Sequence, residues 1–217
     1  MLWRDLLALL RSPARLVSAV LLALLAAALI AVAGHGRPVS LVLVGSGLSL
    51  GYLAAAWLCE GARLDADDPR RSVPLPFRFQ ALAWWHAGVP CLVLLAATGI
   101  PAAAVCLAAG DLRPLALLVV TGPVLVGGAL VNAFRGSFSP SLFVGVDTPV
   151  GNTAAFSILF WYAWGTVLAV LPMTVLVSSA LRSPGPAPLV RALVIGAGLA
   201  AGLGAYAARR AGRLRAG

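Results

Sequence analysis

The chain has 217 residues, of which 61% are hydrophobic and only 11% charged, and its net charge at pH 7 is +9. This composition excludes an ordinary soluble domain, in which about a quarter of the residues are charged. Several apolar runs reach the roughly 18 to 20 residues that cross a bilayer as a helix. We therefore expect an all-α membrane protein with six transmembrane helices, preceded by an amphipathic interfacial helix.

The basic residues are all arginine, and the sequence contains no lysine. Arginine without lysine, beside abundant alanine, leucine, glycine and valine, is typical of a GC-rich bacterial genome, so we expect a bacterial cytoplasmic membrane. Aromatic residues do not interleave a basic patch as in proteins that bind single strands, so we expect no nucleic-acid partner. A P-loop needs a lysine on the phosphates. The chain therefore cannot form one, and any ATP must be bound by a separate subunit.

The N-terminal residues 1–13 are amphipathic. At 100° per residue, Arg4, Arg11 and Arg15 share one face, whereas four leucines share the opposite face. This pattern predicts a helix in the headgroup plane that directs these three arginines, as anchors, toward anionic lipids. Pro13 should end that helix.

Six apolar runs follow, and residues 14–208 should form the transmembrane domain. The runs are Val17 to Ala33, Val39 to Cys59, Gln80 to Ala109, Leu115 to Ala133, Ala154 to Leu181 and Leu189 to Ala208. Ala31-Val32-Ala33 also resembles a signal-peptide cleavage site. The long amphipathic region before the first run nevertheless favours an uncleaved span.

Prolines and glycines inside these runs predict local features. Pro90 and Pro101 should kink or shorten the third helix. Gly47 and Gly51, and likewise Gly198 and Gly202, have the GxxxG spacing that allows two helices to approach closely.

The most charged stretch, residues 60–79, separates the second and third runs. Ionised side chains are costly in hydrocarbon unless they are compensated, so this loop should face water. Its prolines should confine any helix to about Glu60 to Asp68. We expect it to be a platform on which another component docks.

Asp65, Asp67 and Asp68 could instead hold a metal ion and a diphosphate, as in membrane prenyl- and phosphotransferases. Such enzymes need a second acidic cluster, and the other large loop, residues 135–153, offers only Asp147. Local ion pairs at a helix end are the simpler interpretation. We therefore expect no metal site, no cofactor and no enzymatic activity.

Aromatic residues gather at the start of the fifth run. They are typical of the belt at a membrane surface, but they could also line a path for an amphipathic substrate. The candidate path residues are Phe156, Phe160, Trp161 and Trp164. The spans contain little charge, which argues against a proton relay or an ion pathway and suits a lipid-like or peptide-like cargo.

Arginines are distributed unequally between the two sides of the expected bundle. Twelve fall on the side of the termini and the charged loop, including those of the basic tail, residues 209–217, and four fall on the other side. The positive-inside rule then places both termini in the cytoplasm.

Three segments carry a resemblance to a known family. WRDLLALLRSPARL is similar to the elbow helix of type-two ABC exporter permeases, and EGARLDADDPRRSVPLPFRF is similar to their coupling segment. DTPVGNTAAFSILFWYAWG resembles the start of the fifth span in uncharacterised actinobacterial members. The chain departs from many such permeases in having a short connection between its last two spans.

This resemblance implies a permease subunit that works with a separate P-loop ATPase and as a homodimer, or as a heterodimer with a related half. Its implied ATPase-coupling residues are Glu60, Arg63, Asp67, Asp68, Arg70 and Arg71. Two alternatives remain open, namely a non-catalytic membrane scaffold or accessory subunit and an intramembrane enzyme of lipid metabolism.

Overall fold

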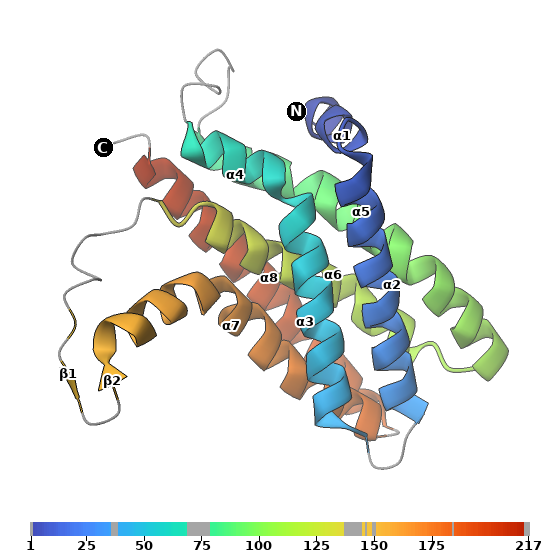
Figure 1. Ribbon diagram of the computed structural model, residues 1–217. Helices are drawn as coiled ribbons and strands as arrows, with labels where there is room; N and C mark the ends of the chain where they lie inside the picture. The colour runs from blue at the N-terminus through green and yellow to red at the C-terminus, as the bar shows by residue number, and fades with distance from the viewer. Residues whose placement is uncertain are drawn as a thin grey trace.

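A computed structural model describes residues 2–35, 39–68, 79–136, 145, 147–148, 151–183 and 185–214. Within these ranges the chain forms eight helices, six of which are long and apolar enough to cross a membrane (Figure 1). The predicted all-α membrane fold with six transmembrane helices is therefore confirmed.

The helices run in chain order. They are α1 (Leu2–Leu10), α2 (Pro13–His35), α3 (Leu41–Leu58), α4 (Glu60–Asp67), α5 (Phe79–Ala109), α6 (Arg113–Ala133), α7 (Thr153–Arg182) and α8 (Pro186–Leu214). Each predicted span is built on one of α2, α3, α5, α6, α7 and α8. A short antiparallel ladder pairs β1 (Asp147–Thr148) with β2 (Gly151–Asn152) just before α7.

Local sequence determines where several helices begin and end. Pro13 begins α2, because a residue without an N–H group is tolerated in the first turn of a helix. The side chains of Ser40 and Asn152 accept hydrogen bonds from the first turns of α3 and α7, at 3.3 Å and 2.8 Å. Gly110, with φ of 68°, follows the last turn of α5. The predicted break between α1 and α2 is confirmed.

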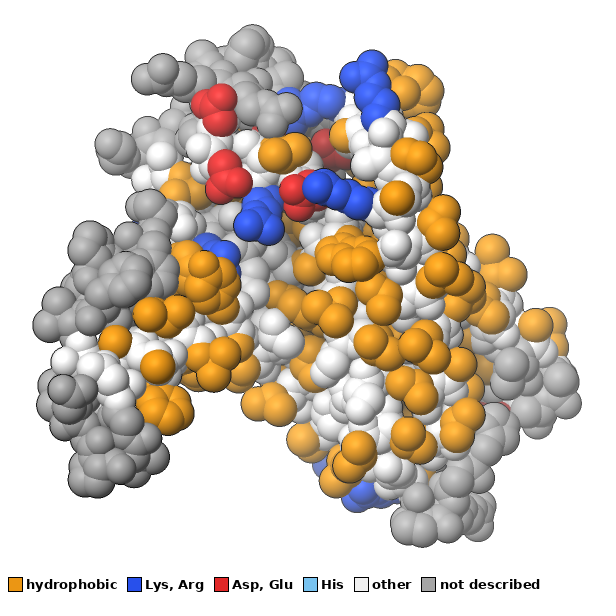
Figure 2. Space-filling view, viewed as in Figure 1, with side chains coloured by type: hydrophobic (Ala, Val, Ile, Leu, Met, Phe, Trp, Pro, Cys, Tyr) orange, Lys and Arg blue, Asp and Glu red, His pale blue; other side chains and the backbone are white. Residues whose placement is uncertain are grey.

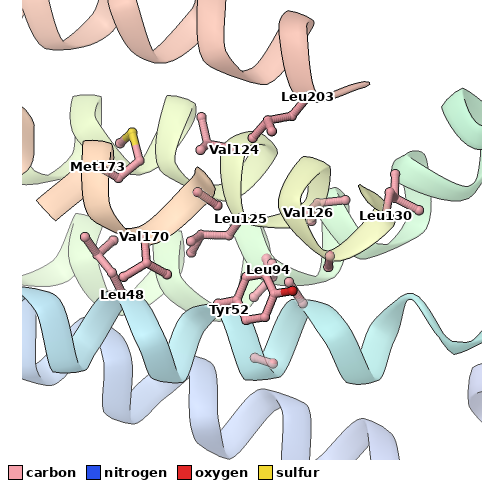
Figure 3. Close-up of a cluster of buried hydrophobic side chains, with 14 of the residues drawn as sticks. Leu48, Tyr52, Leu94, Val124, Leu125, Val126, Leu130, Val170, Met173 and Leu203 are labelled. Carbon is pink, nitrogen blue, oxygen red and sulfur yellow. The ribbon is translucent and has the colours of Figure 1, made fainter. Parts of the chain in front are cut away.

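The helix at the centre of the bundle is α6. Every residue from Val124 to Val131 is buried, and α6 contacts α3, α5, α7 and α8. Figure 3 shows α6 between α3 and α8, with side chains such as Leu48 and Leu203 packed around it. Among the six candidate spans of the described residues, α6 is the one buried over most of its length, whereas the others expose more large apolar side chains, such as Val42 of α3.

Glycines allow close contact at two helix crossings. A Cβ atom on Gly47 would lie 3.0 Å from the carbonyl oxygen of Ala26 in α2, and one on Gly128 would lie 2.6 Å from the Cβ of Ala169 in α7. The predicted close approach at Gly47 is thus confirmed. By contrast, a Cβ on either glycine of the Gly198–Gly202 pair would meet no other described atom within 4 Å.

The structure bears on two expectations about helix length. Of the two effects expected of Pro90 and Pro101, shortening is not seen, because α5 continues through both of them and covers the whole predicted run, as membrane helices with neighbours to satisfy the freed carbonyls often do. A kink at either proline stays a prediction. The sixth span also does not stop before the basic tail. It continues to Leu214, so the arginines at 209, 210 and 213 lie on its last turns.

The N-terminal helix, α4 and the last turns of α8 lie at the same end of the bundle (Figure 1). Arg4 of α1 is hydrogen-bonded to Asp65 of α4, and Leu214 of α8 lines a pocket with Arg63 of α4. The turns before α6 and α8 meet at the opposite end, where Arg113 donates a hydrogen bond to the backbone carbonyl of Ser183 at 3.2 Å. We refer to the first end as the α4 end.

Candidate functional site

The short helix α4, which follows α3 and precedes α5 in the chain, lies across one end of the bundle (Figure 1). Its inner face buries Ala62 and Asp65, and its outer side exposes Arg63, Leu64 and Asp67. The helix predicted in the charged loop is confirmed. Figure 2 shows acidic and basic side chains gathered around α1 and α4, above a mostly hydrophobic middle.

Four ionisable side chains meet beneath α4, and we refer to Arg4, Asp5, Asp65 and His86 as the charged cluster. Asp5, Asp65 and His86 are only 7%, 3% and 2% exposed. The Nδ1 atom of His86 lies 2.8 Å from Oδ2 of Asp5, and its Nε2 atom lies 3.1 Å from Oδ2 of Asp65. Arg4 donates from Nη2 to that same oxygen of Asp65. The cluster therefore joins α1, α4 and α5.

Charges in this cluster balance. An ionised carboxylate can only accept hydrogen bonds, and each ring nitrogen of His86 faces a carboxylate oxygen. His86 therefore donates from both nitrogens as an imidazolium, and together with Arg4 it neutralises Asp5 and Asp65. Buried charges are tolerated when they are paired and hydrogen-bonded, and this set meets both conditions.

The carboxyl group of Asp65 is the centre of the cluster. Burial raises its pKa, but hydrogen bonds from His86 and Arg4, together with their positive charges, outweigh burial and hold the pKa below its ordinary value. Asp65 is therefore ionised at neutral pH. Its charge-assisted hydrogen bonds are of the stronger kind and fix α4 to α1 and α5.

A second ion pair joins α4 to the start of α2. The Nη1 atom of Arg15 lies 3.2 Å from Oε1 of Glu60, and the two side chains are 54% and 27% exposed. Such a pair contributes only about 0 to 1 kcal/mol. The buried cluster, more than this pair, therefore positions α4.

A pocket of about 380 Å³ opens where α4, α6, α7 and the end of α8 meet, and we refer to it as the polar pocket. Its polar and aromatic lining residues are Arg63, Asp67, Asn132, Arg135 and Trp161. These side chains come from segments far apart in the chain. The fold therefore places two arginines and one carboxylate around one small volume.

Arg135 follows α6 and rests on aromatic rings. The central carbon of its guanidinium lies 4.1 Å from the ring centre of Trp161 and 4.2 Å from that of Tyr162, within the range of cation–π attraction. Burial lowers the pKa of Arg135, and repulsion from Arg63 acts in the same direction. The two rings thus hold a partly buried cation beside a second one.

Asn132, at the inner wall of the pocket, connects three helices. Its Nδ2 atom donates to the hydroxyl oxygen of Tyr52 at 2.6 Å and to the carbonyl of Tyr162 at 3.0 Å, and its Oδ1 atom accepts from the N–H of Gly165 at 2.9 Å. A side chain that bonds to helix backbone groups and an internal proline, here Pro172, are both causes of helix bending, and α7 bends along its length in Figure 1. Asn132 therefore fixes α6 to α3 and to α7.

The predicted coupling residues fall on both sides of α4. Arg63 and Asp67 line the polar pocket, Glu60 pairs with Arg15, and Asp68 is exposed. The remaining two, Arg70 and Arg71, lie outside the described residues. Docking of an ATPase on these residues stays a prediction.

The four candidate path residues do not line a common pocket in the described part of the chain. Trp161 lines the polar pocket, and Trp164 packs against the core. Phe156 and Phe160 are 58% and 53% exposed. The interpretation as an interfacial belt and the interpretation as a substrate path both stay predictions.

Two of the three predicted lipid anchors pair with carboxylates of α4. Arg4 is bonded to Asp65 and Arg15 to Glu60, whereas Arg11 is exposed. Contact of these arginines with anionic lipids stays a prediction.

Sequence reasoning missed Asp5, His86 and Asn132 as structural centres. A usable signal was present, because ionisable groups in or beside a membrane span are rare and need a partner. His86 and Asp5 are such groups, and pairing them would have placed α1 against α5. Asn132, a polar residue near the end of a span, was a weaker signal of the same kind.

In the described part of the chain, no group of three or more His, Cys, Asp or Glu side chains is arranged to hold a metal ion. Comparisons with protein-family models, curated proteins and solved structures found no match. The function is therefore inferred from the residues of this chain alone.

Proposed function

We propose that this chain is the membrane-spanning permease subunit of an ATP-driven exporter of the ABC type, with a separate ATPase that docks on α4. The observation that carries the proposal is the position of α4 between the second and third spans. Buried ion pairs fix its inner face, and its outer side is exposed and charged. Such a helix is suited to receive a partner and to transmit the partner's movement.

Two routes would carry a displacement of α4 into the spans. On one side, Asp65 is bonded to Arg4 of α1 and to His86 of α5. On the other side, Arg63 and Asp67 line the polar pocket together with residues of α6 and α7. A push on α4 would thus reach most of the bundle.

The packing of the bundle favours a pair of permease subunits. Because α6 fills the centre of the six spans, a substrate path would form between this chain and a second copy or a related half. A cavity of about 420 Å³ between α2, α5 and α6 is lined mainly by apolar side chains, with Asp111 and Arg113 at its margin. This lining suits a hydrophobic or amphipathic substrate.

The arginine distribution supports a bacterial cytoplasmic membrane with the α4 end in the cytoplasm. That orientation is the one in which α4 would meet an ATPase and its ATP. The absence of lysine, and hence of a P-loop, requires that a partner binds the ATP.

The test is recovery of a P-loop ATPase with the tagged chain from mildly solubilised membranes of the native host, followed by mass spectrometry. Wild-type protein should recover one such ATPase, and a variant with Leu64→Ala and Asp68→Ala should lose it. Both side chains are exposed, so the melting temperature should stay unchanged. Truncating desolvated groups at an interface costs about 2 to 5 kcal/mol of association.

Arg191→Ala, an exposed arginine of α8 toward the opposite end, is the matched control and should retain the ATPase. Recovery of another membrane protein without any ATPase would favour a scaffold or accessory subunit. Equal recovery of the ATPase by wild type and variant would place its docking surface elsewhere.

A further inference from the structure

Two arginines, Arg63 and Arg135, line the polar pocket. Arg4, Arg15 and Arg113 each pair with a carboxylate. Among the described residues, no carboxylate lies within the 4.0 Å of a salt bridge from Arg63 or Arg135. The pocket therefore brings together two cations that no salt bridge within the described part of the chain neutralises.

The guanidinium of Arg135 is prepared to bind an anion. The ring centres of Trp161 and Tyr162 lie 4.1 Å and 4.2 Å from its central carbon, so two aromatic rings hold it by cation–π attraction. Cation–π contact uses the charge of a guanidinium and not its N–H donors, and a planar fork of N–H groups matches a phosphate. An anion between Arg135 and Arg63 would also relieve the repulsion between them.

The depth of the pocket matches that of lipid headgroups. The membrane span of α6 ends at Ala133, and Arg135 lies two residues beyond it. Arg210 of α8 donates to the carbonyl of Val131 at 3.3 Å, which adds a third positive charge close to the same level. Basic pockets between transmembrane helices at this level are suited to anionic headgroups.

We propose that the polar pocket binds a phosphate group, of the kind that the headgroup of an anionic membrane lipid carries, between Arg63 and Arg135. Asp67 also lines the pocket, and its carboxylate opposes an anion there. The two arginines outweigh this single negative charge. The proposal does not depend on transport or on an ATPase.

The test is native mass spectrometry of the detergent-purified full chain titrated with phosphatidylglycerol, phosphatidylcholine or inorganic phosphate. Phosphatidylglycerol should be retained in preference to phosphatidylcholine. Arg63→Gln and Arg135→Gln should each weaken its retention about fivefold, since a cation near an anionic surface contributes about that factor. Asp67→Asn should strengthen retention.

Arg209→Gln is the matched control, because it removes one positive charge from an exposed site on α8 at the same end. It should leave retention unchanged. If inorganic phosphate competes with the lipid, and that competition is lost in Arg135→Gln, the phosphate group itself is the recognised feature. If inorganic phosphate binds with the same arginine dependence while the lipid does not, the source is a soluble phosphate and the site still stands.

Equal retention by wild type, Arg63→Gln and Arg135→Gln would overturn the proposal, as would an equal loss in Arg209→Gln. Arg63 is on the exposed side of α4, so its variant should fold even if replacing the stacked Arg135 unfolds the end of α6. The Arg63 and Asp67 variants should shift lipid retention in opposite directions. They therefore test the proposed phosphate site even if Arg135→Gln does not fold.

Discussion

The Nδ1 atom of His86 lies 2.8 Å from a carboxylate oxygen of Asp5, although 81 positions separate the two residues in the chain. Both side chains are buried. The contact closes the N-terminal helix onto the third span, and Asp65 brings α4 into the same network. The three helices should therefore respond together when the cluster is disturbed.

Removing one member of the cluster should destabilise the protein strongly. Asp5→Asn leaves an excess positive charge, and His86→Gln leaves two carboxylates beside one arginine. Losing one partner of a buried pair costs about 3 to 5 kcal/mol, so each variant should melt at a clearly lower temperature in detergent. Limited proteolysis should also cut near α1 sooner.

The double variant with both changes tests whether these residues act as a pair. Because it restores charge balance around Arg4 and Asp65, it should be more stable than the sum of the single effects predicts. Simple additivity of the two losses would show that the contact between Asp5 and His86 carries no energy of its own.

The cluster should also make stability depend on acid pH. Hydrogen bonds and positive partners hold the pKa of Asp65 below its ordinary value despite burial, so the unfolded chain binds this proton at a higher pH than the folded chain. The resulting stabilisation is complete above the ordinary aspartate pKa of about 3.9. It is lost as the pH falls below that value toward the folded pKa.

Melting temperatures measured from neutral pH down to acid pH should show this loss in the wild-type protein. Asp65→Asn should be less stable at neutral pH and should have a flatter profile in acid. A variant profile parallel to that of the wild type would assign the acid sensitivity to other groups.

Asn132 should matter for stability although it is not part of the charged cluster. Asn132→Leu leaves the N–H of Gly165 without its side-chain acceptor and removes the amide donor to the hydroxyl of Tyr52, which keeps its hydrogen bond with Thr166. Each buried group left unsatisfied costs about 1 to 3 kcal/mol. Thermal unfolding should show that Asn132→Leu lowers the free energy of unfolding more than Asn152→Ala does. Asn152 is an exposed helix cap, and its loss costs only about 1 kcal/mol.

The spans and α4 could be predicted from the sequence because their causes are local. A run of apolar residues must cross the bilayer as a helix, and the charge and proline of residues 60–79 limit α4 to its observed length. The inner position of α6 was less evident. Its apolar run resembles the others, and burial depends on which neighbours surround it.

The site could not be predicted to the same extent because it is made of long-range pairs. Nothing near Asp5 in the chain indicates that its partner is His86, and Arg4 could equally have faced a lipid headgroup. Likewise, Gly47 and Gly198 occur in the same GxxxG pattern, but of the two only Gly47 closely meets a neighbouring helix among the described residues. Such differences arise from the arrangement of the helices, which local patterns do not specify.

Single-cysteine labelling should show how the bundle is oriented in the membrane. Single cysteines at Arg11 and Leu64 would mark the α4 end, and single cysteines at Leu112 and Gly185 would mark the opposite end; all four positions lie outside the spans. The native cysteines, at 59, 91 and 106, would first be replaced by alanine. In intact cells, a membrane-impermeant maleimide should label positions 112 and 185 and should reach positions 11 and 64 only after the cells are opened.

The reverse pattern would keep the fold but invert the orientation, and α4 would then be on the wrong side for an ATPase. Labelling of one position from each pair in intact cells would contradict the six-span arrangement itself.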